Sequence, residues 1–262
     1  MSDSAGTVVG RREGSVGWLI VDNERRRNAM SLAMWREAGS VLASLVGDPS
    51  VRAIVVAGRG EKAFVSGADI SKFEAERNDA ASAQAYDHAA FGFLDALARA
   101  PKPTVAAIRG YCIGGGVSLA VACDLRICDE LARFAVSAAR LGLGYGARGL
   151  ARLAAIVGEA NARWLLLTGE QVDASRALGM GLVHEVIGSS AFDRRLSSLL
   201  ETLAGNAPLS LQAVKIGLEE IAAHDSAFPR SAEAVQRCFS SADFAEGRRA
   251  FLEKRQPRFE GR

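Results

Sequence analysis

The chain has 262 residues, of which 49% are hydrophobic and 24% are charged. This composition excludes a disordered or collagen-like chain, and the length predicts one large domain or one domain with a smaller appendage. Lys and Arg number 32 against 30 Asp and Glu, so the net charge of +2 gives no large electrostatic field to hold a polyanion. Nucleic-acid binding as the main task is therefore disfavoured.

Short runs rich in β-branched residues and bounded by turn formers are typical of buried strands. In chain order, they lie at residues 17–21, 51–57, 104–108 and 125–128. Helical patterns lie between and around them at residues 31–46, 86–99 and 116–123. Because strands and helices alternate along the chain, the predicted fold class is α/β.

Two stretches share one design: a strand, a turn that contains glycine, and a helix that opens with small residues. The first runs from residues 53–57 to 66–70, and the second from 104–108 to 114–118. This indicates a short internal repeat. From about Asn206 onward the pattern is almost entirely helical, so we predict a core in residues 1–205 and a C-terminal helical region in residues 206–262.

The first six residues carry no basic region followed by an apolar one, so no signal peptide is expected. The longest uncharged stretch, residues 110–123, is shorter than the ~18 residues that a spanning helix needs. The four cysteines have no C-x-x-C spacing and are interpreted as ordinary buried thiols. We therefore expect a cytoplasmic protein with no membrane partner.

Residues 144–149 fit the pattern G-x-G-x-x-G. A dinucleotide fingerprint must follow a strand, and residues 137–142 are a poor buried strand, so we reject a nicotinamide cofactor. His88, His184 and His224 lack the spacing of metal ligands. They are interpreted as surface or internally bonded side chains, and no metal site is predicted.

Three consecutive glycines, Gly114 to Gly116, stand where a helix is expected to begin. Because glycines have no Cβ atoms, a ligand can reach the unpaired N–H groups of the first helical turn. These N–H groups are suited to bind an oxygen that gains negative charge during a reaction. Close packing of the helix on a strand is the alternative, and the glycines alone do not decide. A second turn of small residues at 64–70 supplies another donor, and two donors that converge on one oxygen make an oxyanion hole.

At this point four separated segments resemble the enoyl-CoA hydratase/isomerase (crotonase) superfamily. Residues 62–70 and 110–116 are similar to its two oxyanion segments, 23–31 to its N-terminal signature and 251–259 to its usual ending. The resemblance implies a spiral of ββα units followed by a helical trimerisation region, assembled as a homotrimer or a dimer of trimers. It also implies an acyl-CoA substrate, whose coenzyme A is part of the substrate, so no separate cofactor is expected.

The resemblance further implies that the backbone amides of Ala68 and Gly115 hold the thioester carbonyl and stabilise its enolate. Contacts to coenzyme A are carried over to residues of both ends of the chain: Arg25 and Lys62 for the nucleotide phosphates, Ala63, Ala68, Asp69 and Ile70 of the first oxyanion segment, and Phe251 and Lys254 of the terminal helix. By its own chemistry, Asp69 is interpreted as a capping residue rather than a catalyst. Asp124 and Asp129 are interpreted as structural residues at helix and strand ends.

The chemistry departs from that of the hydratases, because Ser118 and Ala138 stand where the family has its two glutamates. Water addition needs a base and an acid, and neither side chain supplies one readily. Tyr145 stands in an L-G-x-x-Y run similar to that of superfamily decarboxylases acting on methylmalonyl-CoA. It could orient a departing carboxylate or supply a proton, although packing beside the pocket is the alternative.

Tyr86, Asp87 and His88 lie in a segment that often borders the acyl pocket in this family, and any of them could replace a missing acid or base. Solvated helix surface is the simpler interpretation, and we favour it. We place decarboxylation or another lyase reaction first, with Ala68, Gly115, Ser118 and Tyr145 as the catalytic set. The alternatives are an enoyl-CoA hydratase that uses other groups, and a binding protein that holds acyl-CoA without turnover.

Overall fold

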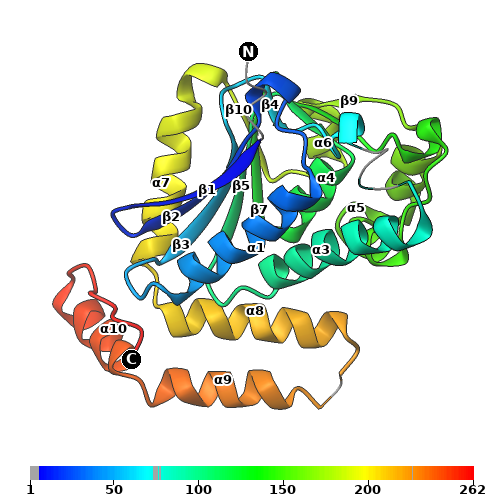
Figure 1. Cartoon of the computed structure of the whole chain (residues 1–262). Helices are drawn as coiled ribbons and strands as arrows, with labels where there is room; N and C mark the ends of the chain where they lie inside the picture. The colour runs from blue at the N-terminus through cyan, green and yellow to red at the C-terminus, as the bar shows by residue number, and fades with distance from the viewer. Residues whose placement is uncertain (1–5, 73–75, 77, 226) are drawn as a thin grey trace.

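The computed structural model describes residues 6–72, 76, 78–225 and 227–262, and two sheets form its centre (Figure 1). The larger sheet has the strand order β1-β2-β3-β5-β7-β10. These strands are β1 (Thr7–Glu13), β2 (Val16–Asp22), β3 (Ala53–Gly58), β5 (Thr104–Ile108), β7 (Leu125–Asp129) and β10 (Glu185–Ile187). Strands β1 and β2 pair antiparallel, and all other pairs of this sheet are parallel.

The smaller sheet has the order β4-β6-β8-β9, with β4 (Ala63–Val65), β6 (Tyr111–Ile113), β8 (Arg133–Ala135) and β9 (Val172–Asp173). The chain alternates between the sheets: β3 leads to β4, β5 to β6, and β7 to β8. Each pair places its first strand in the larger sheet and its second in the smaller. The predicted α/β class and the internal repeat are confirmed, and a third unit extends the repeat.

Helices surround the sheets. In the described residues they are α1 (Leu32–Gly47), α3 (Ala80–Ala98), α4 (Gly115–Ala122), α5 (Ala147–Thr168), α6 (Ala174–Gly179), α7 (Phe192–Gly205), α8 (Pro208–Ala222), α9 (Pro229–Phe239) and α10 (Ala242–Glu253). Short 3-10 turns lie at η1 (Glu24–Arg26), η2 (Ile70–Lys72), η3 (Ala138–Leu141) and η4 (Ser189–Ala191). None of these helices is long and apolar enough to cross a membrane.

Strand β3 shows how the core divides, because successive side chains of a strand point to opposite faces. Ala53 and Val55 pack in a cluster with Phe192 of α7, whereas Ile54 and Val56 belong to the larger cluster that includes α1, α3 and α4. The larger sheet is therefore covered on both faces. This explains why its central strands are continuous apolar runs in the sequence.

Helices α8, α9 and α10 lie beyond the end of the sheets, with α9 and α10 farthest out (Figure 1). Helix α8 begins with Pro208 at its first turn, where a missing N–H costs nothing, and α10 begins after Ser241, whose side chain caps Phe244 N. The helical character expected after Asn206 is confirmed. That this region forms a separate domain stays a prediction.

Several elements were not predicted, and for two of them, β1 and α5, the reason can be seen in the structure. Strand β1 is missing from the sequence prediction because four of its seven residues are exposed and its charged end obscures the alternation. Helix α5 was missed because Gly158 interrupts it with a φ of 75°. The strand expected at 51–57 begins later, at Ala53, and β4 stands between it and the small-residue turn.

Three of the cysteines are buried inside the core, as expected, and the fourth, Cys238, is half-buried. Burial raises the pKa of the Cys123 and Cys128 thiols to about 12 and that of Cys112 well above its usual value. These thiols are therefore protonated and unreactive near neutral pH.

Candidate active site

The small-residue turn at residues 64–70, which is the first of the two along the chain, is shaped by the segment around Met30. Met30 N donates to Gly67 O at 2.8 Å, and Asp69 N donates to Met30 O at 2.9 Å. Together they form a parallel bridge between Met30 and Ala68. Because Met30 bonds the peptide groups on either side of Ala68, the N–H of Ala68 itself points to the opposite side.

Asn28 fixes the segment that carries Met30. Its side chain is buried, and its amide nitrogen donates to Ala63 O at 2.7 Å and to Arg59 O at 3.0 Å. Its Oδ1 accepts from Asn23 N at 3.0 Å. The residue has a φ of 57°, a left-handed conformation that Asn tolerates better than most residues. Asn28 thus joins the N-terminal loop to the start of β4, a role that sequence reasoning missed.

The glycines of the second turn have separate tasks. Gly114 has a φ of 54°, and its N–H donates to Ala135 O at 2.8 Å. A Cβ at Gly116 would overlap the carbonyl oxygen of Val65, so this glycine lets α4 pack on β4. Gly115 is the first residue of α4 and has no acceptor within the helix for its N–H. Gly116 therefore serves close packing, whereas Gly115 leaves an N–H without an acceptor at the start of the helix.

The two turns lie next to each other, with no room for more than a methyl group between them. A Cβ at Gly115 would lie 3.7 Å from the Cα of Gly67, and one at Gly67 would lie 3.8 Å from the amide nitrogen of Gly115. Within the described residues, no hydrogen bond uses the amide of Ala68 or of Gly115. Two unpaired donors thus stand at adjoining turns, and such a pair can bind one oxygen.

A pair of hydroxyls lies one helical turn from Gly115. Ser118 is three residues further along α4, and its Oγ lies 2.7 Å from the hydroxyl of Tyr145. Burial raises the pKa of Tyr145 above its usual value, so the phenol is protonated at neutral pH. The structure thus brings together two predicted residues that are 27 positions apart.

The G-x-G-x-x-G run, residues 144–149, includes this tyrosine and lacks the strand that a dinucleotide fingerprint follows. The turn η3 and a loop precede it, and no strand leads into it. A Cβ at Gly149 would lie 2.7 Å from Cε1 of Tyr145, so Gly149 makes room for the ring. Ala138, where a glutamate was sought, begins η3, and its carbonyl accepts from Leu143 N at 3.0 Å.

Asp69 has the capping role expected of it. Its Oδ1 accepts from the amide of Ser71 at 3.1 Å and from its hydroxyl at 2.7 Å, and Arg26 lies 3.4 Å away. The carboxylate is therefore occupied at the start of η2. Asp124 and Asp129 are also structural, since Asp124 accepts from Thr104 N at 2.8 Å and Asp129 from Gly110 N at 3.4 Å.

For Tyr86, the prediction that the side chains of residues 86–88 lie on a solvated helix surface is wrong. Tyr86 is only 5% exposed, and its hydroxyl donates to Met30 O at 3.1 Å. It was misjudged because α3 begins before it, at Ala80, and turns this side chain toward α1. Asp87 and His88 line a cavity of about 370 Å³ between α3 and the start of α5. Gly146, the residue that follows Tyr145 in the chain, also lines this cavity.

The other histidines lie elsewhere. His184 Nδ1 accepts from Arg126 N at 3.1 Å, and burial together with the Arg126 charge lowers its pKa. His224 is exposed at the end of α8. Among the described residues, no three side chains of metal-binding type come together.

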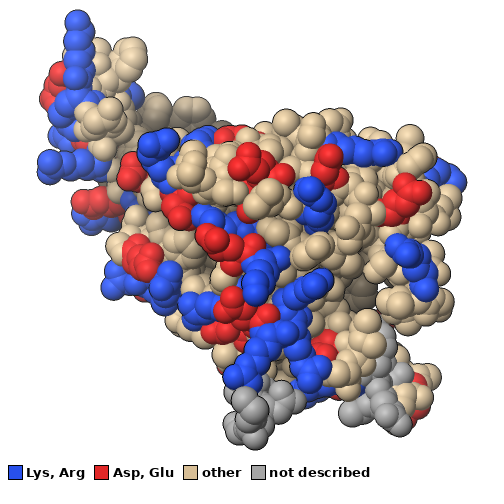
Figure 2. Space-filling model, turned by 90° about the horizontal axis from the view of Figure 1, so that it is seen from above, with Lys and Arg blue, Asp and Glu red and all other residues tan. Residues whose placement is uncertain are grey.

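The residues that the family resemblance assigns to coenzyme A binding lie in two separate regions of the structure. Arg25, Lys62 and Ile70 are exposed near the first turn, and Ala63 is buried at the start of β4. Basic and acidic side chains are mixed over the face seen from above, so no single sign of charge covers it (Figure 2). Phe251 and Lys254 belong to α10 and its C-cap, and α10 lies at the opposite end of the molecule from β4 (Figure 1).

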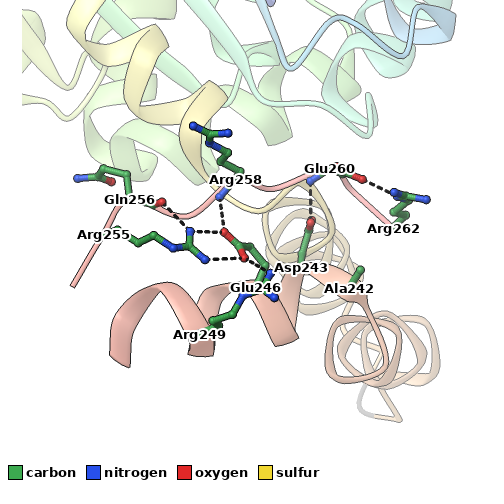
Figure 3. Close-up of a pocket in the computed structure, with 9 residues that line it drawn as sticks. All are labelled: Ala242, Asp243, Glu246, Arg249, Arg255, Gln256, Arg258, Glu260 and Arg262. Atoms are coloured by element: carbon green, nitrogen blue, oxygen red, sulfur yellow. Dashed lines mark hydrogen bonds and ion pairs between the residues drawn. The ribbon is translucent and has the colours of Figure 1, made fainter. Parts of the chain in front are cut away.

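A cavity of about 730 Å³ lies beside α10, where the C-terminal tail folds back (Figure 3). Its acidic groups are already bonded: Asp243 accepts from the amides of Glu260 and Gly261, and Glu246 from the side chain of Arg255 at 2.6 Å. This cavity is thus a by-product of tail anchoring and lies on a different element from the paired turns.

Comparison with known proteins places these features in a wider group. Residues 11–262 match the family described as enoyl-CoA hydratase/isomerase. The chain is 33% identical to the short-chain-enoyl-CoA hydratase of Clostridium acetobutylicum over 259 residues, 95% of either protein. It is 36% identical to a putative enoyl-CoA hydratase of Thermus thermophilus over 252 residues, 94% of this chain and 98% of the relative.

Solved structures agree with the fold. The crystal structure of an enoyl-CoA hydratase/carnithine racemase from Magnetospirillum magneticum superimposes with a TM-score of 0.95 at 31% identity, over 99% of this chain and 97% of that one. An enoyl-CoA hydratase from Bacillus anthracis gives a TM-score of 0.92 at 27% identity, over 98% and 100%.

The packing of the Tyr145 ring against Gly149 can be tested with a pair of glycine substitutions. In Gly149→Ala the new Cβ would displace the Tyr145 ring, so we expect the Ser118 contact to be lost and the free energy of unfolding to fall by about 1–3 kcal/mol. Gly144→Ala is the matched control, since a Cβ there meets nothing within 4 Å. Urea unfolding measures the free energy of unfolding of both variants. Equal stability of the two would contradict the packing of the Tyr145 ring against Gly149.

Proposed function

The chain belongs to the enoyl-CoA hydratase/isomerase family and is an acyl-CoA-processing enzyme, and we propose that the amides of Ala68 and Gly115 form its oxyanion hole. The observation that carries this proposal is that two unpaired backbone N–H groups stand at turns that lie next to each other. The thioester carbonyl oxygen of the substrate accepts from both donors. Negative charge on this oxygen grows as an enolate forms, so the bonds strengthen during the reaction.

Helix α4 adds to this stabilisation. Gly115 is its first residue, where the aligned peptide dipoles leave a partial positive charge. Backbone donors of this kind need no side chain, and they are already oriented before the substrate arrives. The same hole therefore serves any reaction of an acyl-CoA that passes through an enolate.

The side chains next to the hole favour decarboxylation among such reactions. Tyr145 and Ser118 are hydrogen-bonded hydroxyls, and the raised pKa of Tyr145 keeps its phenol protonated, so it has a proton to give but cannot act as a base. In the proposed reaction the bond between the α-carbon and the substrate carboxylate breaks. Its electron pair forms the thioester enolate, and carbon dioxide leaves.

A proton then completes the reaction at the α-carbon of the enolate. We assign it to the Tyr145 hydroxyl, which regains a proton from water through Ser118. No general base takes part, in keeping with Ser118 and Ala138 at the positions of the two glutamates. The reaction is accordingly that of a lyase.

Hydration is the second candidate, and the names of relatives favour it. The chain is 29% identical to a crotonyl-CoA hydratase of Syntrophomonas wolfei over 255 residues, 96% of this chain and 97% of that relative. A hydratase mechanism needs a base, and we assign this role to Asp87 or His88, which line the cavity beside α3. A protein that binds acyl-CoA without turnover is the third candidate.

Coenzyme A contacts are proposed for both ends of the chain. Arg25 and Lys62 are exposed beside the first turn and are assigned to the phosphates, with Ala63, Asp69 and Ile70 lining the approach. Phe251 and Lys254 belong to a different part of the molecule. They are assigned to the coenzyme A of a neighbouring chain, which requires an oligomer. Location in the cytoplasm stays a prediction from the sequence.

The assembly is proposed to be a homotrimer or a dimer of trimers formed through the C-terminal helices. Val214, Leu218 and Ile221 lie on one face of α8, and they are 61%, 62% and 59% exposed in the single chain. Light scattering of the purified protein should give the mass of three or six chains. Leu218→Lys should reduce that mass, and a wild-type mass of one chain would contradict the proposal.

The oxyanion hole is tested by a matched pair at one position. Gly115→Pro removes the N–H, whereas Gly115→Ala keeps it, and a Cβ there makes ordinary contacts of 3.6 Å or more. We expect kcat to fall by about 10²–10³-fold in Gly115→Pro relative to Gly115→Ala. Circular dichroism checks that both are folded, and equal kcat values would contradict the role of this amide.

The reaction is tested by parallel assays with methylmalonyl-CoA and crotonyl-CoA, following release of carbon dioxide and loss of the enoyl absorbance. Decarboxylation should fall by about 10²–10⁴-fold in Tyr145→Phe, because this variant lacks the proposed proton donor. Hydration that survives Ser118→Ala would instead show that another group replaces both glutamates. Silence in both assays, with tight binding of acyl-CoA, would favour the binding protein.

A further inference from the structure

Two buried aromatic side chains link α1 and α3 behind the proposed oxyanion hole. Trp35 of α1 is 2% exposed and Tyr86 of α3 is 5% exposed. The indole Nε1–H of Trp35 donates to the Tyr86 hydroxyl at 2.8 Å, and this hydroxyl donates to Met30 O at 3.1 Å. The bonds form a directed chain that ends on one backbone carbonyl.

That carbonyl belongs to the bridge that orients Ala68. Met30 O also accepts from Asp69 N at 2.9 Å, so the Tyr86 hydroxyl and the Asp69 amide share one acceptor. A shift of Met30 also moves its own N–H, which bonds Gly67 O, and so changes the direction of the peptide that carries the Ala68 N–H. Tyr86 therefore acts on the first donor of the hole through Met30.

Trp35 also reaches the second donor. A Cβ built on Gly115 would lie 3.6 Å from Cζ2 of Trp35, so the edge of the indole faces the start of α4. The ring is packed against Phe93, with the two centroids 5.9 Å apart. One rigid side chain thus contacts the turn of Gly115 directly and the turn of Ala68 through Tyr86.

Both turns need such support because the glycines in them allow many backbone conformations. Gly67 has a φ of 103° and Gly114 a φ of 54°, and neither has a side chain to restrict its peptide. Two donors stabilise a developing oxyanion only if their positions hold to about 0.5 Å. A buried ring with a bonded N–H can supply that rigidity.

We propose that Trp35 and Tyr86 are positioning residues that set the separation and direction of the Ala68 and Gly115 amides. The inference rests on the proposed oxyanion hole and adds the side chains that shape it. Neither residue touches the substrate. Removing the Tyr86 hydroxyl leaves the indole N–H unpaired and Met30 O with one donor fewer, so the Ala68 amide loses its fixed direction.

The test is the infrared carbonyl frequency of butyryl-CoA labelled with ¹³C at the thioester carbon. This saturated probe has neither a double bond to hydrate nor a carboxylate to lose. Binding to the wild-type protein should lower the frequency, because two hydrogen bonds polarise the carbonyl. Tyr86→Phe should lose part of this shift, while the Kd for free coenzyme A, which has no acyl carbonyl, stays unchanged.

Tyr111→Phe is the matched control, since it also removes one phenol hydroxyl, for which no hydrogen bond is found among the described residues. It should keep the full shift. Trp35→Phe provides a second variant with the same expected loss, and thermal unfolding shows that each protein is folded. With an active substrate, Tyr86→Phe should lower kcat by about tenfold to a hundredfold at nearly constant KM.

The outcomes separate the two levels of the argument. A shift in the wild type that Tyr86→Phe and Trp35→Phe both retain would overturn the positioning role and leave the oxyanion hole intact. No shift in the wild type would overturn the oxyanion hole, and the positioning role with it. Loss of the shift in both aromatic variants, and not in Tyr111→Phe, would support the inference.

Discussion

The site depends on a single piece of backbone pairing, the parallel bridge between Met30 and Ala68. Met30 bonds the peptides before and after Ala68, and this leaves the Ala68 amide directed away from the bridge, on the side open to the second turn. Asn28 holds the same segment to the start of β4 by side-chain bonds to backbone carbonyls. The N-terminal loop therefore shapes a turn that lies some forty residues later in the chain.

The fold supplies the electrostatics of the site and the side chains supply its specificity. Repetition of the strand pairs β3–β4 and β5–β6 brings two turns together, and glycines at both allow backbone contact. A hole made of main-chain donors survives the replacement of catalytic side chains. Here Ser118 and Tyr145 form a neutral hydrogen-bonded pair in which neither group carries charge at neutral pH. This neutral pair is the basis of our proposal of an enolate reaction without a base.

Sequence reasoning found the features that repeat or are strongly periodic. It placed the central strands, the two small-residue turns and the helical end of the chain, because apolar runs and glycine clusters have local causes. It missed strands of three residues such as β4 and β8, which are too short to show a period. It also missed several residues whose role is set by a distant partner. Tyr86 bonds Met30 and Trp35, and Asn28 bonds the carbonyl of Ala63; none of these contacts leaves a signal in the local sequence.

The most direct test of the account is the contribution of the thioester carbonyl to binding. Calorimetry would compare butyryl-CoA with its S-butyl thioether analogue, which has the same chain and coenzyme but no carbonyl. Two hydrogen bonds of about 0.5–1.5 kcal/mol each predict that the thioester binds about tenfold to a hundredfold more tightly. Equal Kd values for the two compounds would contradict the assignment of Ala68 and Gly115 as carbonyl donors.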